Sequence, residues 1–242
     1  MFENKIAIVT GGTGGLGRVV TEKFAQSGMK VYIPARNIEQ FKDIFDSSKS
    51  SESVEFKLRK IYGLQCNNEN ESEVIEFIGN VINQEGRIDF LVNTVGGYHP
   101  KINIVDMDSS LVDKMMSLNF KTAFYFSKNV LKSMIEHNYG RIISIAAMPA
   151  LEVTAGKFAY SVSKSAVVNL MQTIAEECKG YNITANAIVP SIIDTEANRR
   201  TMPKAEFEKW VKEDEIAETI LYLLSDNAKS FRGNVIKMYG KV

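Results

Sequence analysis

Short apolar runs alternate along the chain with longer segments in which apolar residues recur at helical spacing. The apolar runs end at glycine or polar turn residues, as strands buried on both faces of a parallel sheet do. Strands are predicted at 5–10, 31–34, 88–93, 141–146, 183–189 and 235–238, and helices at 16–27, 70–84, 109–136, 157–179 and 214–225. Right-handed helical crossovers join such strands, so the pattern predicts a doubly wound α/β domain with about seven parallel strands and helices on both faces.

The chain is expected to form one domain. Its 242 residues suit a single large α/β core and are few for two. Residues 37–60 are polar and rich in lysine and serine, and we expect a mobile surface segment there.

Composition narrows the classes of function. The 29 basic and 29 acidic residues cancel, which indicates no nucleic-acid partner. Cys66 and Cys178 are too few for a metal site or a disulfide framework and favour a reducing compartment. Neither a signal peptide nor an apolar run of about eighteen residues is visible. We therefore expect a cytoplasmic protein with no metal and no membrane partner.

The first chemical motif is Thr-Gly-Gly-Thr-Gly-Gly-Leu-Gly at 10–17, between a predicted strand and a predicted helix. Glycines at 11, 15 and 17 permit a tight turn, close approach of a pyrophosphate to backbone N–H groups, and close packing of helix on strand. The alternative is a turn that only needs positive φ. The flanking elements favour dinucleotide binding and a Rossmann-type fold.

Arg36, after the second strand, bears on the choice of cofactor. A carboxylate normally holds the ribose hydroxyls of NAD at this position, but the chain has Pro-Ala-Arg-Asn at 34–37. A guanidinium fork suits a 2′-phosphate, so NADP(H) is the predicted preference and NAD(H) remains possible. The alternative is a solvated surface arginine.

Tyr160 and Lys164 form the second motif. Residues i and i+4 share a helix face, so the ammonium can lie near the phenol oxygen. An unperturbed tyrosine has a pKa of ~10, and a nearby positive charge should lower it. Tyr160 is therefore a candidate general acid for carbonyl or imine reduction, although a Tyr-x-x-x-Lys spacing alone is common by chance.

Together these residues resemble the short-chain dehydrogenase/reductase family over nearly the whole chain. The resemblance implies that Asn119 supports a proton relay beside Lys164, and that Tyr160 and Lys164 also contact the cofactor. It further implies a set of cofactor-binding residues: Gly11, Thr13, Gly15, Leu16, Gly17, Arg36, Asn67, Asn93, Gly96, Pro190, Ile193 and Thr195.

The chain departs from the family pattern at its catalytic serine, where it has Ala147. Thr94 replaces a usual asparagine, and Asn67 stands where an aspartate often contacts adenine. Losing a donor to a developing oxyanion typically lowers the rate ~10²–10³-fold. Tyr98 and His99 lie in a loop that could enter a substrate pocket, although for His99 an exposed loop position is the favoured interpretation.

Dihydropteridine reductases resemble this chain in carrying alanine at the serine position. The Gly-Gly-Tyr at 96–98 and the segment 194–210 strengthen the resemblance. It implies a substrate pocket that includes Tyr98, Ala147 and Trp210, with a lid near 191–212. Pro203 can open a short helix there that places Phe207 and Trp210 on one face. Packing of both rings against the body of the domain is the alternative.

Three functions follow as hypotheses. The favoured one is an NAD(P)H-dependent reductase of a reactive small molecule, quinonoid or imine-like, such as a dihydropteridine. The second is a general carbonyl or 3-oxoacyl reductase, and the third is an NADP(H)-binding sensor or scaffold. The helices at 109–136 and 157–179 correspond to interface helices of relatives, so a homodimer or homotetramer is expected.

Overall fold

The core is a seven-stranded parallel sheet in the order β3-β2-β1-β4-β5-β6-β7. The computed structural model describes residues 2–45 and 60–242. Its strands are β1 (Ile6–Thr10), β2 (Lys30–Ala35), β3 (Ile61–Gln65), β4 (Phe90–Asn93), β5 (Gly140–Ile145), β6 (Ile183–Pro190) and β7 (Val235–Met238). The strand order reverses direction between β1 and β4, and ligands of open α/β sheets bind in the crevice at that point.

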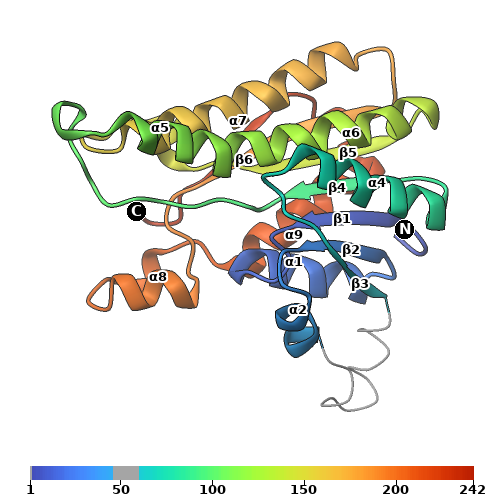
Figure 1. The fold of residues 1–242 in the computed structure, drawn as a ribbon, viewed down its shortest axis with the longest axis horizontal. Helices are drawn as coiled ribbons and strands as arrows, with labels where there is room; N and C mark the ends of the chain where they lie inside the picture. Colours follow the sequence, from blue (N-terminus) through green and yellow to red (C-terminus); the bar gives the residue numbers. More distant parts are fainter. Residues whose placement is uncertain (1, 46–59) are drawn as a thin grey trace.

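Helices cover both faces of the sheet, as the alternating pattern predicted (Figure 1). They are α1 (Gly15–Gln26), α2 (Ile38–Phe45), α4 (Glu71–Glu85), α5 (Ser109–Met115), α6 (Thr122–Glu136), α7 (Phe158–Glu177), α8 (Glu196–Thr201) and α9 (Glu213–Leu224). α4, α6 and α7 pack into one apolar core and α1 and α9 into the other. None of the helices in the described ranges is long and apolar enough to cross a bilayer.

The central strands are apolar because both of their faces are buried. All five residues of β1 are buried, with Ile6 and Ile8 in the α4–α6–α7 core and Ala7 and Val9 in the α1–α9 core. Successive side chains of a strand point to opposite faces, so a strand with a helix layer on each side needs a continuous apolar run.

The polar segment predicted at 37–60 contains more regular structure than expected. Residues 38–45 form α2, and residue 61 begins β3, a strand that the apolar pattern did not reveal. Phe41 packs so closely on β3 that a Cβ at Gly63 would lie 2.5 Å from its ring, and Phe45 is buried. Tertiary packing of these two rings therefore stabilises a helix in a polar stretch. Residues 46–59 lie outside the described residues.

Two predicted helices differ in detail from those observed. The helix expected at 109–136 is continuous but contains a π-helical segment, Met116–Lys121, between α5 and α6. The prediction of a short helix opened by Pro203 is wrong, because α8 ends before that proline and the stretch from Pro203 to Trp210 contains only a 3₁₀ turn, Phe207–Lys209. Thr195 caps α8 by accepting a hydrogen bond from the Asn198 N–H at 3.1 Å.

Candidate active site

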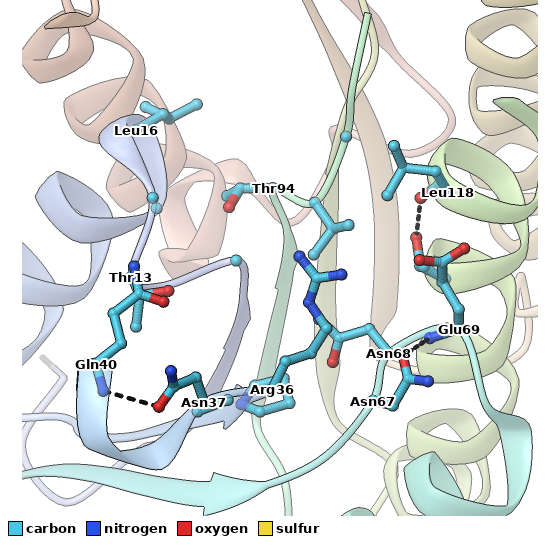
Figure 2. Close-up of a pocket in the computed structure, with 18 of the residues that line it drawn as sticks. Thr13, Leu16, Arg36, Asn37, Gln40, Asn67, Asn68, Glu69, Thr94 and Leu118 are labelled. Carbon is cyan, nitrogen blue, oxygen red and sulfur yellow. Dashed lines mark hydrogen bonds between the residues drawn. The ribbon is translucent and has the colours of Figure 1, made fainter. Parts of the chain in front are cut away.

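A cavity of about 350 Å³ opens at the carboxyl ends of β1, β2, β3 and β4. Figure 2 shows side chains from these strand ends converging on it. Eight of the residues predicted to bind a cofactor line the cavity: Gly11, Thr13, Gly15, Leu16, Gly17, Arg36, Asn67 and Gly96. They come from four separate stretches of the chain, and the parallel sheet brings these stretches together because the carboxyl ends of its strands all lie on one side.

The glycine-rich turn at the end of β1 has a backbone that side chains would block. Gly11 has φ +69°, and a Cβ at Gly17 would lie 2.1 Å from the carbonyl oxygen of Gly11. Gly14 precedes α1 without any side-chain cap, and the first turn of α1 contains no acidic residue. The N–H groups at the start of α1 are therefore available to an anion in the cavity, where the helix dipole also favours negative charge.

Arg36 follows β2 and lines the cavity. Figure 2 shows its guanidinium between Thr13 and Gln40 on one side and Asn67 to Glu69 on the other. Within the described ranges, no carboxylate forms an ion pair with Arg36. The Gln65 side chain donates a hydrogen bond to the Arg36 carbonyl at 2.9 Å and fixes this backbone. Among the described residues nothing neutralises the guanidinium, so it can accept an anionic ligand group.

Sequence reasoning did not assign the other residues that line the cavity: Gly14, Pro34, Ala35, Asn37, Gln40, Asn68, Glu69, Thr94, Val95, Leu118 and Thr122. Most of them follow the carboxyl end of a strand. Asn68 and Glu69 follow β3, so they could not be placed while that strand was unidentified. Identification of β3 from Ile61–Gln65 would have indicated them.

Lys164 and Asn119 meet the cavity at Gly96. A Cβ at Gly96 would lie 2.8 Å from the Lys164 Nζ and 3.1 Å from the Asn119 Oδ1. Asn119 is fixed by the neighbouring Gly97, whose N–H donates to its Oδ1 at 2.7 Å and whose carbonyl accepts from its Nδ2 at 3.1 Å. The Lys164 ammonium donates to the carbonyl of Ile145 at 2.9 Å. Gly96 therefore joins the nucleotide-sized cavity to the residues predicted to be catalytic.

The acid–base properties of the pair differ from the prediction. Burial, and then the neighbouring Tyr98, raise the pKa of Tyr160 to about 12, while burial lowers the pKa of Lys164 to about 8. The prediction that Lys164 lowers the pKa of Tyr160 is therefore wrong for this arrangement, since desolvation disfavours both charged forms. At neutral pH the phenol holds its proton, which suits a donor, and the amine is mostly an ammonium.

Two features distinguish the region of Tyr160: its ring has an aromatic neighbour, and position 147 carries alanine and therefore no hydroxyl. Ala147 is buried. The ring of Tyr98 meets the ring of Tyr160 edge-on at 5.4 Å between centroids. His99 is 6% exposed, so the expectation of an exposed loop histidine is wrong. Its Nδ1 lies 2.6 Å from the Pro100 carbonyl, and its buried Nε2 has no partner within the described part of the chain.

Several predicted site residues lie away from the cavity. The side chain of Asn93 is buried and donates to Ser144 Oγ at 3.0 Å. Trp210 is buried with its ring 4.9 Å from that of Phe207. Pro190 pairs with Met238 of β7 and Ile193 bridges to Val211, and neither residue lines the described cavity.

Thr195 borders the glycine turn without lining the cavity. Its Cγ2 lies 3.1 Å from a Cβ built at Gly15. Residues 2–45 and 60–242 contain no group of three or more His, Cys, Asp or Glu side chains that could hold a metal ion.

The sheet order, the glycine turn and the cavity at the strand ends define a dinucleotide-binding α/β domain of the Rossmann type. The family model of the short chain dehydrogenases matches residues 5–206. The chain therefore belongs to the short-chain dehydrogenase family, with its sheet and both helix layers in place.

Characterised relatives cover the chain almost end to end. A 7alpha-hydroxysteroid dehydrogenase of Paraclostridium sordellii is 29% identical over 99% of this chain and 92% of its own length. The 3-oxoacyl-[acyl-carrier-protein] reductase FabG of Aquifex aeolicus is 26% identical over 99% of this chain and 97% of its own. A solved short-chain type dehydrogenase/reductase from Mycobacterium ulcerans superposes with a TM-score of 0.91 at 25% identity, covering 99% and 90% of the two chains.

Proposed function

We propose that this protein is an NADPH-dependent reductase of carbonyl groups. The observation that carries the proposal is that Gly96, which lines the cavity, lies against both Lys164 and Asn119; this supports a catalytic role for residues next to a cavity lined by the glycine turn. Arg36 supports NADPH over NADH, since it offers a guanidinium where no carboxylate of the described residues neutralises it.

The chain's own groups supply the proton. Bound NADPH supplies the hydride to the carbonyl carbon. Tyr160 then donates its phenolic proton to the oxygen that becomes the alcohol, and its raised pKa keeps that proton in place at neutral pH until an alkoxide develops. Lys164 is buried and mostly cationic at neutral pH, and its ammonium is held by the carbonyl of Ile145 and lies against Gly96, where it can contact the bound cofactor. Asn119 fixes the backbone of the loop at Gly97 through two hydrogen bonds.

A reactive quinonoid or imine-like acceptor, such as a dihydropteridine, is the second candidate. Ala147 supports it, because the position offers no hydroxyl to a developing oxyanion. Absence of one such donor typically lowers the rate ~10²–10³-fold for an ordinary ketone. An acceptor that is reduced easily needs less of this stabilisation.

The test is an NADPH-oxidation assay with a 3-oxo ester and with quinonoid dihydropteridine, on the unmodified protein, Tyr160→Phe and Ala147→Ser. Tyr160→Phe should lower kcat by ~10²–10⁴-fold with a much smaller change in the Kd for NADPH. Ala147→Ser should accelerate reduction of the ester if that is the ordinary substrate class, and should leave pterin turnover nearly unchanged. Binding of NADPH without hydride transfer to any acceptor would contradict the proposal and favour a nucleotide sensor.

A further inference from the structure

Two lysines, Lys101 and Lys157, come from separate loops that lie against each other near Tyr160. The N–H of Ile102 donates to the carbonyl of Gly156 at 2.9 Å. Gly156 has φ +77°, and a Cβ there would lie 3.0 Å from the Cβ of Lys101. The loop after Gly97 and the turn before α7 are therefore in direct backbone contact, and this contact brings the two lysines together.

Lys157 and the proposed proton donor, Tyr160, both contact the ring of Tyr98. The Lys157 Nζ is 5.5 Å from the centroid of the Tyr98 ring. The same ring stacks on the His99 ring at 6.0 Å and meets the Tyr160 ring at 5.4 Å between centroids. Tyr98 is 55% exposed, so a small molecule in solvent can reach this residue.

Neither lysine has a counter-ion within residues 2–45 and 60–242. Glu152 comes from the same loop as Lys157, but its carboxylate lies 3.9 Å from the ammonium of Lys237. Partial burial, and then the charge of Lys101, lower the pKa of Lys157. Two uncompensated like charges at the mouth of a site are unfavourable in the unliganded protein and favour an anion there.

We propose that Lys101 and Lys157 bind an anionic group of the substrate, so that the enzyme reduces oxo compounds that carry a carboxylate about one ring width from the reacting carbonyl. The inference rests on the proposed reductase function and names its substrate class. The C=O bond gains a hydride at carbon from NADPH and the Tyr160 proton at oxygen, which leaves an alcohol and NADP⁺. The distant carboxylate is unchanged and serves for binding and orientation.

A matched pair of aldehydes tests the proposal: 4-carboxybenzaldehyde and methyl 4-formylbenzoate. The ester is the more electron-poor aldehyde, so a preference for the acid cannot arise from intrinsic reactivity. We expect kcat/KM for the acid to exceed that for the ester by ~10-fold or more, as for a charge-assisted contact. Added KCl should reduce this ratio.

Three variants locate the effect. Lys157→Met and the double variant Lys101→Met/Lys157→Met should bring the acid-to-ester ratio of kcat/KM close to unity. Lys229→Met is the control, because Lys229 is an exposed lysine far from the proposed site. It follows Asp226, which pairs with Arg141 at the amino end of β5, whereas the cavity lies at the carboxyl ends of the strands. Lys229→Met should leave the ratio unchanged.

Equal kcat/KM for acid and ester in the unmodified protein would overturn the inference while leaving the reductase function intact. The same conclusion would follow if the double variant kept the preference. If neither aldehyde were reduced, the proposed reductase function would fail for aromatic aldehydes. Calorimetric titration of the NADP⁺-loaded protein with each aldehyde would then test the anion site by binding alone. Tighter binding of the acid, lost in the double variant, would support it, and equal binding of acid and ester would overturn it.

Discussion

Burial determines the chemistry of individual side chains in this site. Tyr160 and Lys164 are one helical turn apart, yet their pKa values move in the directions that desolvation dictates and not in the direction of mutual attraction. The Lys164 ammonium is held by the Ile145 carbonyl. A phenol that keeps its proton at neutral pH is suited to giving that proton to a basic oxygen.

Arg36 should set the choice of cofactor. Arg36→Asp is expected to lower kcat/KM for NADPH by ~10- to 100-fold, because a charge-assisted contact to a 2′-phosphate contributes ~1.5–3 kcal/mol. The ratio of kcat/KM values for NADPH and NADH, measured with one acceptor, reports the effect.

Two controls separate this role from a general effect of charge. Arg36→Lys keeps the charge but loses the planar fork, so its NADPH preference should be intermediate. Lys132→Asp changes the charge by the same amount as Arg36→Asp at an exposed position of α6 and should not change the ratio. Equal use of both cofactors by the unmodified protein would refute the role assigned to Arg36.

Individual elements show where local sequence patterns suffice and where they do not. β1 and the turn that follows it were predictable, since an apolar run and a glycine spacing are properties of adjacent residues. β3 and α2 were missed, because they stabilise each other through the packing of Phe41 on Gly63. These two residues are separated in the chain by residues 46–59, so no local pattern contains both. The π-helical segment that carries Asn119 is likewise not marked by the apolar pattern of residues 109–136.

In the segment after β6, the carboxylate of Asp194 pairs with two cationic side chains. Asp194, with only 5% of its side chain exposed, accepts hydrogen bonds from Arg199 at 2.5 and 2.9 Å and from Lys212 at 2.5 Å. These partners lower the pKa of Asp194 in the folded protein. An unfolded aspartate has a pKa of ~3.9, so the stabilisation is present above that pH and is lost as the pH falls through the lower folded value.

Asp194→Asn should therefore lower the free energy of unfolding by about 1 kcal/mol at pH 7, because both cationic partners are half exposed and solvent screens the pairs. The difference from the unmodified protein should shrink below pH ~4, where the aspartate of the unfolded chain becomes protonated. Urea unfolding at several pH values measures it. Glu196→Gln, in an exposed pair with Arg200, should change stability by a few tenths of a kcal/mol at most. If Asp194→Asn lost the same free energy of unfolding at pH 3 and at pH 7, the effect would come from a change in packing and not from the charge of Asp194.

The whole molecule presents apolar side chains on the outer faces of its long helices. Phe158 and Val162 lie one turn apart on α7 and are 44% and 38% exposed, and Ile135 on α6 is 40% exposed. A second copy of the chain would cover such a face, in keeping with the homodimer or homotetramer that we propose.

Val162→Arg should shift the protein to a smaller species, since a charge at the centre of an apolar interface is desolvated without a partner. Light scattering coupled to size-exclusion chromatography measures the mass. Val153→Arg is the matched control, because Val153 is 100% exposed in the loop before α7 and should leave the mass unchanged. A monomeric unmodified protein at micromolar concentration would contradict the expectation.

The sequence by itself determined the fold class, the glycine turn, and the Tyr160 and Lys164 pair. Each depends on strand or helix periodicity or on backbone freedom, which are set by residues close together in the chain. The tertiary structure decided that Gly96 joins Lys164 and Asn119 to the cavity, that burial raises the pKa of Tyr160, and that Lys101 meets Lys157 beside Tyr98. Desolvation and charge proximity are sums over neighbours that are distant in sequence, and only the folded chain assembles those neighbours.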